Sequence, residues 1–168
     1  MRFLTKLAVG CSALAMPALA YADVVWPALY LETRLFSWWA ISIGLIAEVI
    51  FVKWLFAIPM KRAAIVTTVA NAASSVAGIL LIPLAGIAWE FFPGLLYMKA
   101  LNWGTFNPIT WLATFVLACL VNTAIESFVY RKAYQFPIKR REFGWIFIAN
   151  AVSVGVAFGS LFVVPIQP

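Results

Sequence analysis

The sequence predicts an all-α membrane protein, a bundle of four transmembrane helices preceded by a signal peptide. Of its 168 residues, 65% are hydrophobic and only 11% are charged, and several apolar runs reach the roughly 20 residues needed to cross a bilayer. Many of the eight tryptophans stand near the ends of these runs, as expected for interfacial aromatic belts. A polar pattern that occurs twice further predicts two tandem helical hairpins.

Residues 1–22 are expected to be the signal peptide. Arg2 and Lys6 form a basic start, an apolar run follows, and a small-x-small cleavage site ends at Ala22. Two alternatives stay open. One is an uncleaved anchor, although about 14 apolar residues are short for a span, and the other is a lipoprotein site at Cys11.

Four spans are predicted in the mature chain, at residues 36–58, 63–89, 109–134 and 143–164. Asn107 and Pro108 supply an N-cap and a first-turn proline for the third span, and Pro165 stops the fourth. The expected organisation is an external interfacial segment at 23–35, a first hairpin at 36–89, an external aromatic loop at 90–108 and a second hairpin at 109–165.

Basic residues predict the orientation of the chain. The loops after the first and third spans contain Lys61, Arg62, Arg131, Lys132, Lys139, Arg140 and Arg141. The opposite side has only Arg34 and Lys99, so the positive-inside rule makes both basic loops cytoplasmic. The protein is therefore expected in a bacterial inner membrane, with both termini of the mature chain on the periplasmic side. A secretory signal predicts the same topology.

The two hairpins share a polar pattern in register. A shift of 78 residues places Glu48 on Glu126, Pro59 on Pro137, Lys61 on Lys139 and Arg62 on Arg140, and one further residue places Asn71 on Asn150. Because the two copies cross the membrane in the same sense, they are expected to form a parallel repeat, related by an axis along the membrane normal.

The glutamates and asparagines are predicted to form a polar layer near mid-depth. Glu48 lies about 16 Å from the cytoplasmic end of its helix, and Asn71 about 13 Å along the returning helix. We expect Glu48 within hydrogen-bond or one-water reach of Asn71, and Glu126 within reach of Asn150 or Asn122. Since lipid cannot satisfy these groups, they must point into the bundle.

Two functional interpretations of this layer compete. In the first, Glu48, Asn71, Asn122, Glu126 and Asn150 hold the bundle together, and the protein is an accessory or assembly subunit of a membrane complex. In the second, it is a small transporter or channel subunit that moves a small solute or protons past Glu48 and Glu126. Lys53 and Arg131 are expected to reach toward the cytoplasm rather than pair with the glutamates.

Soluble-enzyme chemistry is nearly excluded. There is no histidine, and Cys119 would be the single cysteine of a mature chain, which removes His-based triads and thiolate metal clusters. Catalysis by carboxylates alone stays open, but we expect no enzyme activity, no cofactor and no metal. The expected partners are the bilayer and either further copies or other membrane subunits. Nucleic acid is not expected, and no small-molecule substrate is defined.

The external loop contains a short apolar segment at residues 95–103, interrupted by Lys99. It is too short to span, so we expect it to lie flat in the interface, with a lid or a partner-binding edge as alternatives. Residues 24–31 have the same character and are expected to pack beside it.

Overall fold

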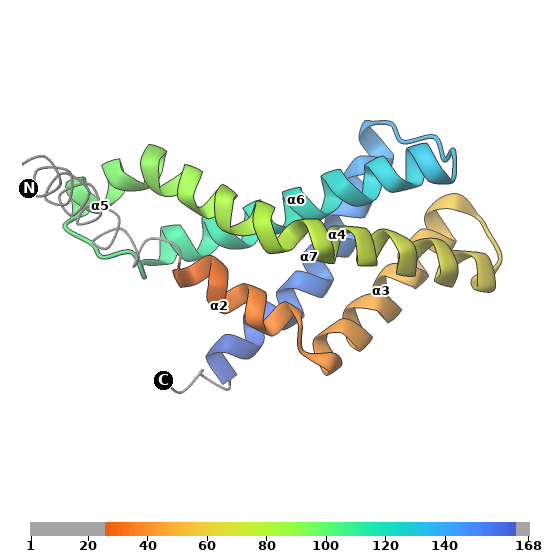
Figure 1. Cartoon of the computed structure of the whole chain (residues 1–168), viewed down its shortest axis with the longest axis horizontal. Helices are drawn as coiled ribbons and strands as arrows, with labels where there is room; N and C mark the ends of the chain where they lie inside the picture. Colours follow the sequence, from red (N-terminus) through yellow and green to blue (C-terminus); the bar gives the residue numbers. More distant parts are fainter. Residues whose placement is uncertain (1–25, 164–168) are drawn as a thin grey trace, which may run out of the picture.

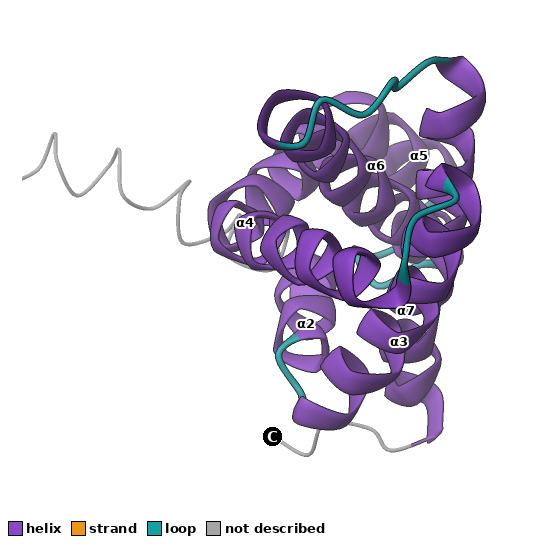
Figure 2. Ribbon diagram, turned by 90° about the vertical axis from the view of Figure 1, so that its right-hand side faces the viewer, coloured by secondary structure: helices purple, strands orange, loops and turns teal. Residues whose placement is uncertain are grey.

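The computed structural model describes residues 26–163, and all the regular elements in this range are helices (Figure 1, Figure 2). The elements are α2 (Trp26–Leu35), α3 (Trp38–Phe56), α4 (Met60–Trp89), the π-helical turn η2 (Glu90–Gly94), α5 (Leu95–Leu101), α6 (Pro108–Ala133) and α7 (Arg140–Val163). Helices α3, α4, α6 and α7 are long and apolar enough to cross a membrane, so the prediction of an all-helical protein with four spans is confirmed. The predicted signal peptide and Pro165 lie outside the described residues.

The helix boundaries follow from local backbone chemistry. Helix α3 ends where Ala57 adopts the left-handed conformation (φ 50°), and Pro59 then directs the chain into α4. At the start of α6 the side chain of Asn107 accepts a hydrogen bond from the backbone N–H of Thr110 at 2.9 Å, with Pro108 at the first helical position. The predicted cap of this helix is therefore confirmed.

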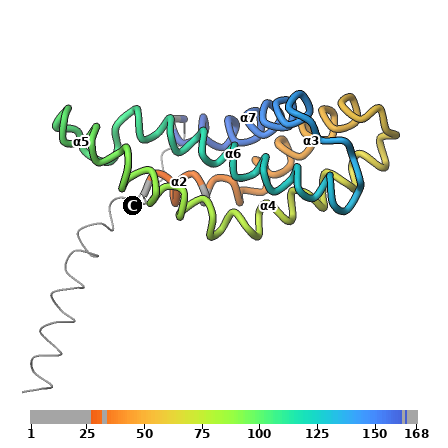
Figure 3. The backbone as a smooth tube through the Cα atoms, turned by 90° about the horizontal axis from the view of Figure 1, so that it is seen from above, coloured from red at the N-terminus to blue at the C-terminus, as the bar shows by residue number. Residues whose placement is uncertain are grey.

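The two hairpins pack across each other rather than side by side. Helix α3 packs mainly on α7, α4 packs mainly on α6, and α6 and α7 are also in contact. The α3–α4 and α6–α7 loops lie at the same end of the bundle (Figure 1, Figure 3). Each long helix therefore has its most extensive contact with a helix of the other hairpin.

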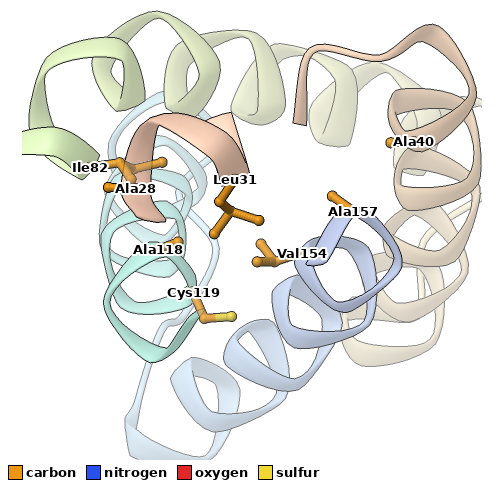
Figure 4. Close-up of a cluster of buried hydrophobic side chains, with 8 residues drawn as sticks. All are labelled: Ala28, Leu31, Ala40, Ile82, Ala118, Cys119, Val154 and Ala157. Carbon is orange, nitrogen blue, oxygen red and sulfur yellow. The ribbon is translucent and has the colours of Figure 1, made fainter. Parts of the chain in front are cut away.

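Helix α2 lies inside the bundle, although residues 23–35 were expected at the interface. It contacts α3, α4, α6 and α7, and its Ala28 and Leu31 are buried. Figure 4 shows Leu31 directed toward Val154 of α7. Ala28 and Leu31 belong to a cluster of buried apolar side chains that we call the α2 cluster. It consists of Ala28, Leu31, Ala40, Ile82, Ala118, Cys119, Val154 and Ala157. The apolar face of α2 is covered by helices instead of lipid, which hydropathy alone cannot distinguish.

A second apolar cluster fills the bundle near the α3–α4 and α6–α7 loops. This loop-end cluster consists of Val52, Ala63, Val66, Ala70, Tyr130, Phe136 and Ile146. The ring of Phe56 stacks on Phe136 with centroids 4.4 Å apart, and the Arg62 guanidinium lies 5.5 Å from the centroid of the same ring. Aromatic side chains therefore close this end of the interior.

The chain continues from α4 into α5 through a kink. Phe92 has extended backbone angles (φ −168°, ψ 123°), which interrupt the helix within η2. No residue of α5 is buried, and α5 extends away from the end of the bundle opposite the two loops (Figure 1, Figure 3). The apolar segment expected from the sequence is thus a short exposed helix.

Candidate functional site

Glu48 of α3 points into the bundle, where its side chain is only 2% exposed. The Asn71 amide of α4 donates a hydrogen bond to Glu48 Oε2, and the Ser153 hydroxyl of α7 donates to Glu48 Oε1 at 2.5 Å. The contact between Glu48 and Asn71 expected from helix geometry is present. One carboxyl group therefore links three helices.

Glu126 of α6 has the corresponding environment and is 1% exposed. The Asn150 amide of α7 donates to Glu126 Oε2 at 2.8 Å, and the Ser74 hydroxyl of α4 donates to Glu126 Oε1 at 3.2 Å. Each glutamate is thus bonded by an asparagine of its own hairpin and by a serine of the other hairpin.

The asparagine amides are fixed by a second hydrogen bond one helical turn back. Asn71 Nδ2 donates to the carbonyl oxygen of Thr67 at 3.1 Å, and Asn150 Nδ2 donates to that of Ile146 at 3.2 Å. A side-chain amide has two hydrogens, and both are used. Each asparagine is therefore held toward its glutamate.

The two serine hydroxyls of this layer each lie near a second acceptor. The Ser74 hydroxyl has one hydrogen but lies within bonding distance of two acceptors, Glu126 Oε1 and the Asn71 carbonyl oxygen at 3.1 Å. Ser153 stands in the same relation to Glu48 and the Asn150 carbonyl oxygen. Both carbonyl oxygens lie within continuous helices and also accept backbone N–H bonds there, so each serine hydrogen is available to the carboxyl oxygen.

Asn122 does not join this network. No hydrogen bond connects it to Glu126 in the described part of the chain, so of the two expected partners only Asn150 contacts Glu126. The Asn122 side chain lies instead toward α4, with its Oδ1 3.9 Å from the position that a Cβ on Gly78 would occupy.

Ser74 and Ser153 were not predicted as partners of the glutamates. Both follow their asparagine by three residues, in the sequences Ala-Asn-Ala-Ala-Ser and Ala-Asn-Ala-Val-Ser. At this spacing the asparagine and the serine lie on one face of a helix. The shared spacing was visible in the sequence, but the identity of the facing helix was not.

The basic side chains are remote from the polar layer. The seven basic loop residues, Lys61, Arg62, Arg131, Lys132, Lys139, Arg140 and Arg141, are all exposed, as is Lys53. Among residues 26–163 neither glutamate forms an ion pair, and no group of acidic, cysteine or histidine side chains is arranged to hold a metal ion. The layer is a hydrogen-bonded structure without a buried cation in the described chain.

Gly44 permits the close approach of α3 to α7. A Cβ at this position would lie 2.7 Å from Ser153 Cβ, well inside contact distance. Small residues at helix crossings let the backbones approach in membranes, which shortens the reach between polar side chains. Gly44 therefore positions the Ser153 hydroxyl against Glu48, which lies one turn further along α3.

Comparisons with known protein families, with curated proteins and with solved structures found no match. The geometry of the polar layer and of the surrounding helices is therefore the basis for the functional argument.

We expect Gly44→Ala to lower the free energy of unfolding by about 1–3 kcal/mol, because the added methyl group forces α3 and α7 apart. Gly159→Ala is the matched control in α7, since a Cβ there meets nothing within 4 Å and alanine favours a helix by roughly 0.5–1 kcal/mol. Unfolding of the purified variants in detergent micelles measures both changes. Equal stability of the two variants would show that the crossing at Gly44 is not tight.

Proposed function

We propose that this protein is an accessory or assembly subunit of a membrane complex, and that its polar layer serves to lock the two hairpins together. The supporting observation is that both glutamates accept a hydrogen bond from each hairpin. In membranes an interhelical hydrogen bond contributes about 0.6 kcal/mol, and up to roughly 2 kcal/mol in favourable cases. Two of the four bonds in the layer, those donated by Ser153 and Ser74, join the two hairpins and therefore constrain how the hairpins dock.

The surroundings of the layer argue against a conduit for protons or solutes. The α2 cluster lies on one side of the layer along the bundle, and the loop-end cluster lies on the other. Among the side chains of these two clusters, only the Cys119 thiol and the Tyr130 hydroxyl could relay a proton. A cavity between α3 and α4 reaches Glu48 without crossing the α2 cluster, but a path on past Glu48 and Glu126 would still need the loop-end cluster to open, so the structural role is the simpler account.

We further propose that the hairpins arose by duplication. A shift of 78 residues places Glu48 on Glu126, and a shift of 79 residues places Asn71 on Asn150 and Ser74 on Ser153. These shifts relate the two sets of hydrogen bonds. The bonds that Glu48 receives from Asn71 and Ser153 correspond to those that Glu126 receives from Asn150 and Ser74. The sequence shift and the bonding pattern together support a duplication, in which each copy supplies a serine to the glutamate of the other.

The basic loops support an orientation in a bacterial inner membrane. Both loops lie at one end of the bundle (Figure 3) and contain the exposed lysines and arginines. The proposal places this end in the cytoplasm and the mature termini on the periplasmic side, after removal of residues 1–22.

The surface proposed to meet a partner is α5 and the loop after it. This segment extends beyond the bundle, and its apolar side chains Leu96, Leu101 and Trp103 are exposed. Apolar side chains gathered outside a folded core mark contacts with lipid or protein. An assembly subunit would use this surface to contact another membrane subunit near the periplasmic face.

Glutamine should replace either glutamate with a loss of stability of at most about 1 kcal/mol. A glutamine amide can donate to the serine oxygen while its carbonyl oxygen accepts from the asparagine, so both partners keep a hydrogen bond. Glu48→Ala and Glu126→Ala leave those partners unbonded and should strongly reduce the amount of folded protein in the membrane. Protein levels and unfolding in detergent measure both effects. Folded glutamine variants that have lost activity in the cell would favour the transport hypothesis instead.

Leu96→Ser should release the protein from its complex, because the change removes an apolar contact from α5 without affecting the bundle. Leu112→Ser is the control, since Leu112 of α6 is exposed to a similar extent (62% against 56%). Native electrophoresis after extraction in mild detergent measures the size of the assembly, and mass spectrometry of the band identifies its members. A wild-type protein that migrates as a single chain without partners contradicts the proposal.

A further inference from the structure

A cavity of about 330 Å³ lies between α3 and α4, beside the end of α2, whose Leu35 is one of its lining residues. Its apolar walls include Phe36, Ile41 and Ile79, all of which are exposed at its edges. Its polar end is formed by the layer around Glu48 and by Asn122. The volume is at the lower end of the roughly 300–1,000 Å³ typical of ligand pockets.

The cavity opens between two membrane-spanning helices, so what enters it comes from the lipid phase. Its polar end lies at the depth of Glu48, about 12 Å from the cytoplasmic end of α3 and about 15 Å from its other end, and therefore near the centre of a hydrocarbon layer about 30 Å thick. The apolar end, with Phe36, lies toward the opposite surface. A phospholipid has the reverse arrangement, with its head group at the surface and its tails at the centre.

The polar groups that face the cavity without a partner are neutral. Within residues 26–163 no hydrogen bond engages the side chains of Thr68, Ser75 or Asn122, although all three line the cavity. Glu48 also lines it, but Asn71 and Ser153 already bond its two oxygens. No basic residue is among the lining residues. The cavity therefore offers hydrogen-bond donors and acceptors but no free charge.

We propose that this cavity binds a lipid-soluble molecule whose compact, neutral head group both donates and accepts hydrogen bonds. Long-chain alcohols, quinols and diacylglycerols share this chemistry. The head group bonds the Asn122 amide and the Ser75 hydroxyl, and the apolar tail lies along Ile41 and Ile79. Unsatisfied polar groups next to hydrocarbon are costly, and such a ligand removes that cost. This binding is independent of the assembly role proposed above.

The test uses the full chain in phosphatidylcholine nanodiscs and a twelve-carbon alcohol that has a photoreactive diazirine next to its hydroxyl group. Cross-linked peptides are mapped by mass spectrometry. We expect saturable labelling within residues 36–48 and 68–82, and competition by unlabelled dodecanol. A phosphatidylcholine with the diazirine at the end of an acyl chain serves as the comparison probe and should label the lipid-facing surface without saturation.

Two variants connect the labelling to the cavity. Ser75→Phe fills it, and Val76→Phe is the matched control, because Val76 is 73% exposed on the neighbouring position and does not line the cavity. We expect Ser75→Phe to reduce saturable labelling about tenfold, which corresponds to a loss of about 1.4 kcal/mol in affinity, and Val76→Phe to leave it unchanged.

Asn122→Leu provides a second route to the same answer, since it removes the amide at nearly constant volume and should also abolish saturable labelling. The proposal is overturned if the alcohol labels the lipid-facing surface uniformly, if Asn122→Leu labels like the wild type, or if the phosphatidylcholine probe labels and competes equally well. If Leu96→Ser reduces assembly and leaves the labelling unchanged, the partner surface of α5 and the cavity act independently.

Discussion

Hydrocarbon offers no hydrogen bonds, and this constraint determines how the helices of this chain can be arranged. Glu48 and Glu126 lie in the middle of long apolar helices, where lipid contact would leave their carboxyl groups without partners. Both are buried instead, and each accepts bonds from two further helices. The pairing of α3 with α7 and of α4 with α6 is the packing that brings the serine of each hairpin to the glutamate of the other.

This packing also accounts for the difference between the two sides of the bundle. Leu31 of α2 packs with Cys119 of α6 and Val154 of α7, so α2 fills the crevice beside the second hairpin. Between α3 and α4 the corresponding space is left as a cavity with Asn122 at its polar end. Under the proposed duplication the two crevices began as equivalents; the single helix α2 closes one of them and borders the other through Leu35. The open crevice is where a ligand of the lipid phase has room.

The sequence predicted the parts of the structure that depend on one helix or on one hairpin. Span positions follow from hydropathy, the start of α6 follows from Asn107 and Pro108, and the Glu48–Asn71 contact follows from helix rise within a hairpin. The bonds from Ser74 and Ser153 depend on how the hairpins dock, which no local pattern specifies. Burial of α2 was missed for a related reason, since an apolar helix of ten residues fits an interface and a crevice equally well. Asn122 shares a helix face with Glu126, but tertiary packing directs it to the cavity.

A double-mutant cycle between Glu48 and Ser153 tests the interlocking of the hairpins most directly. Glu48→Leu and Ser153→Ala, alone and together, are compared by unfolding in detergent micelles. Glu48→Leu combined with Ser160→Ala is the control, because the Ser160 hydroxyl bonds the carbonyl oxygen of Ala157 within its own helix. We expect a coupling energy of about 0.6–2 kcal/mol for Glu48 with Ser153 and additive effects for Glu48 with Ser160. Additive effects in both cycles would contradict the account, because the bond between hairpins would then contribute nothing to their docking.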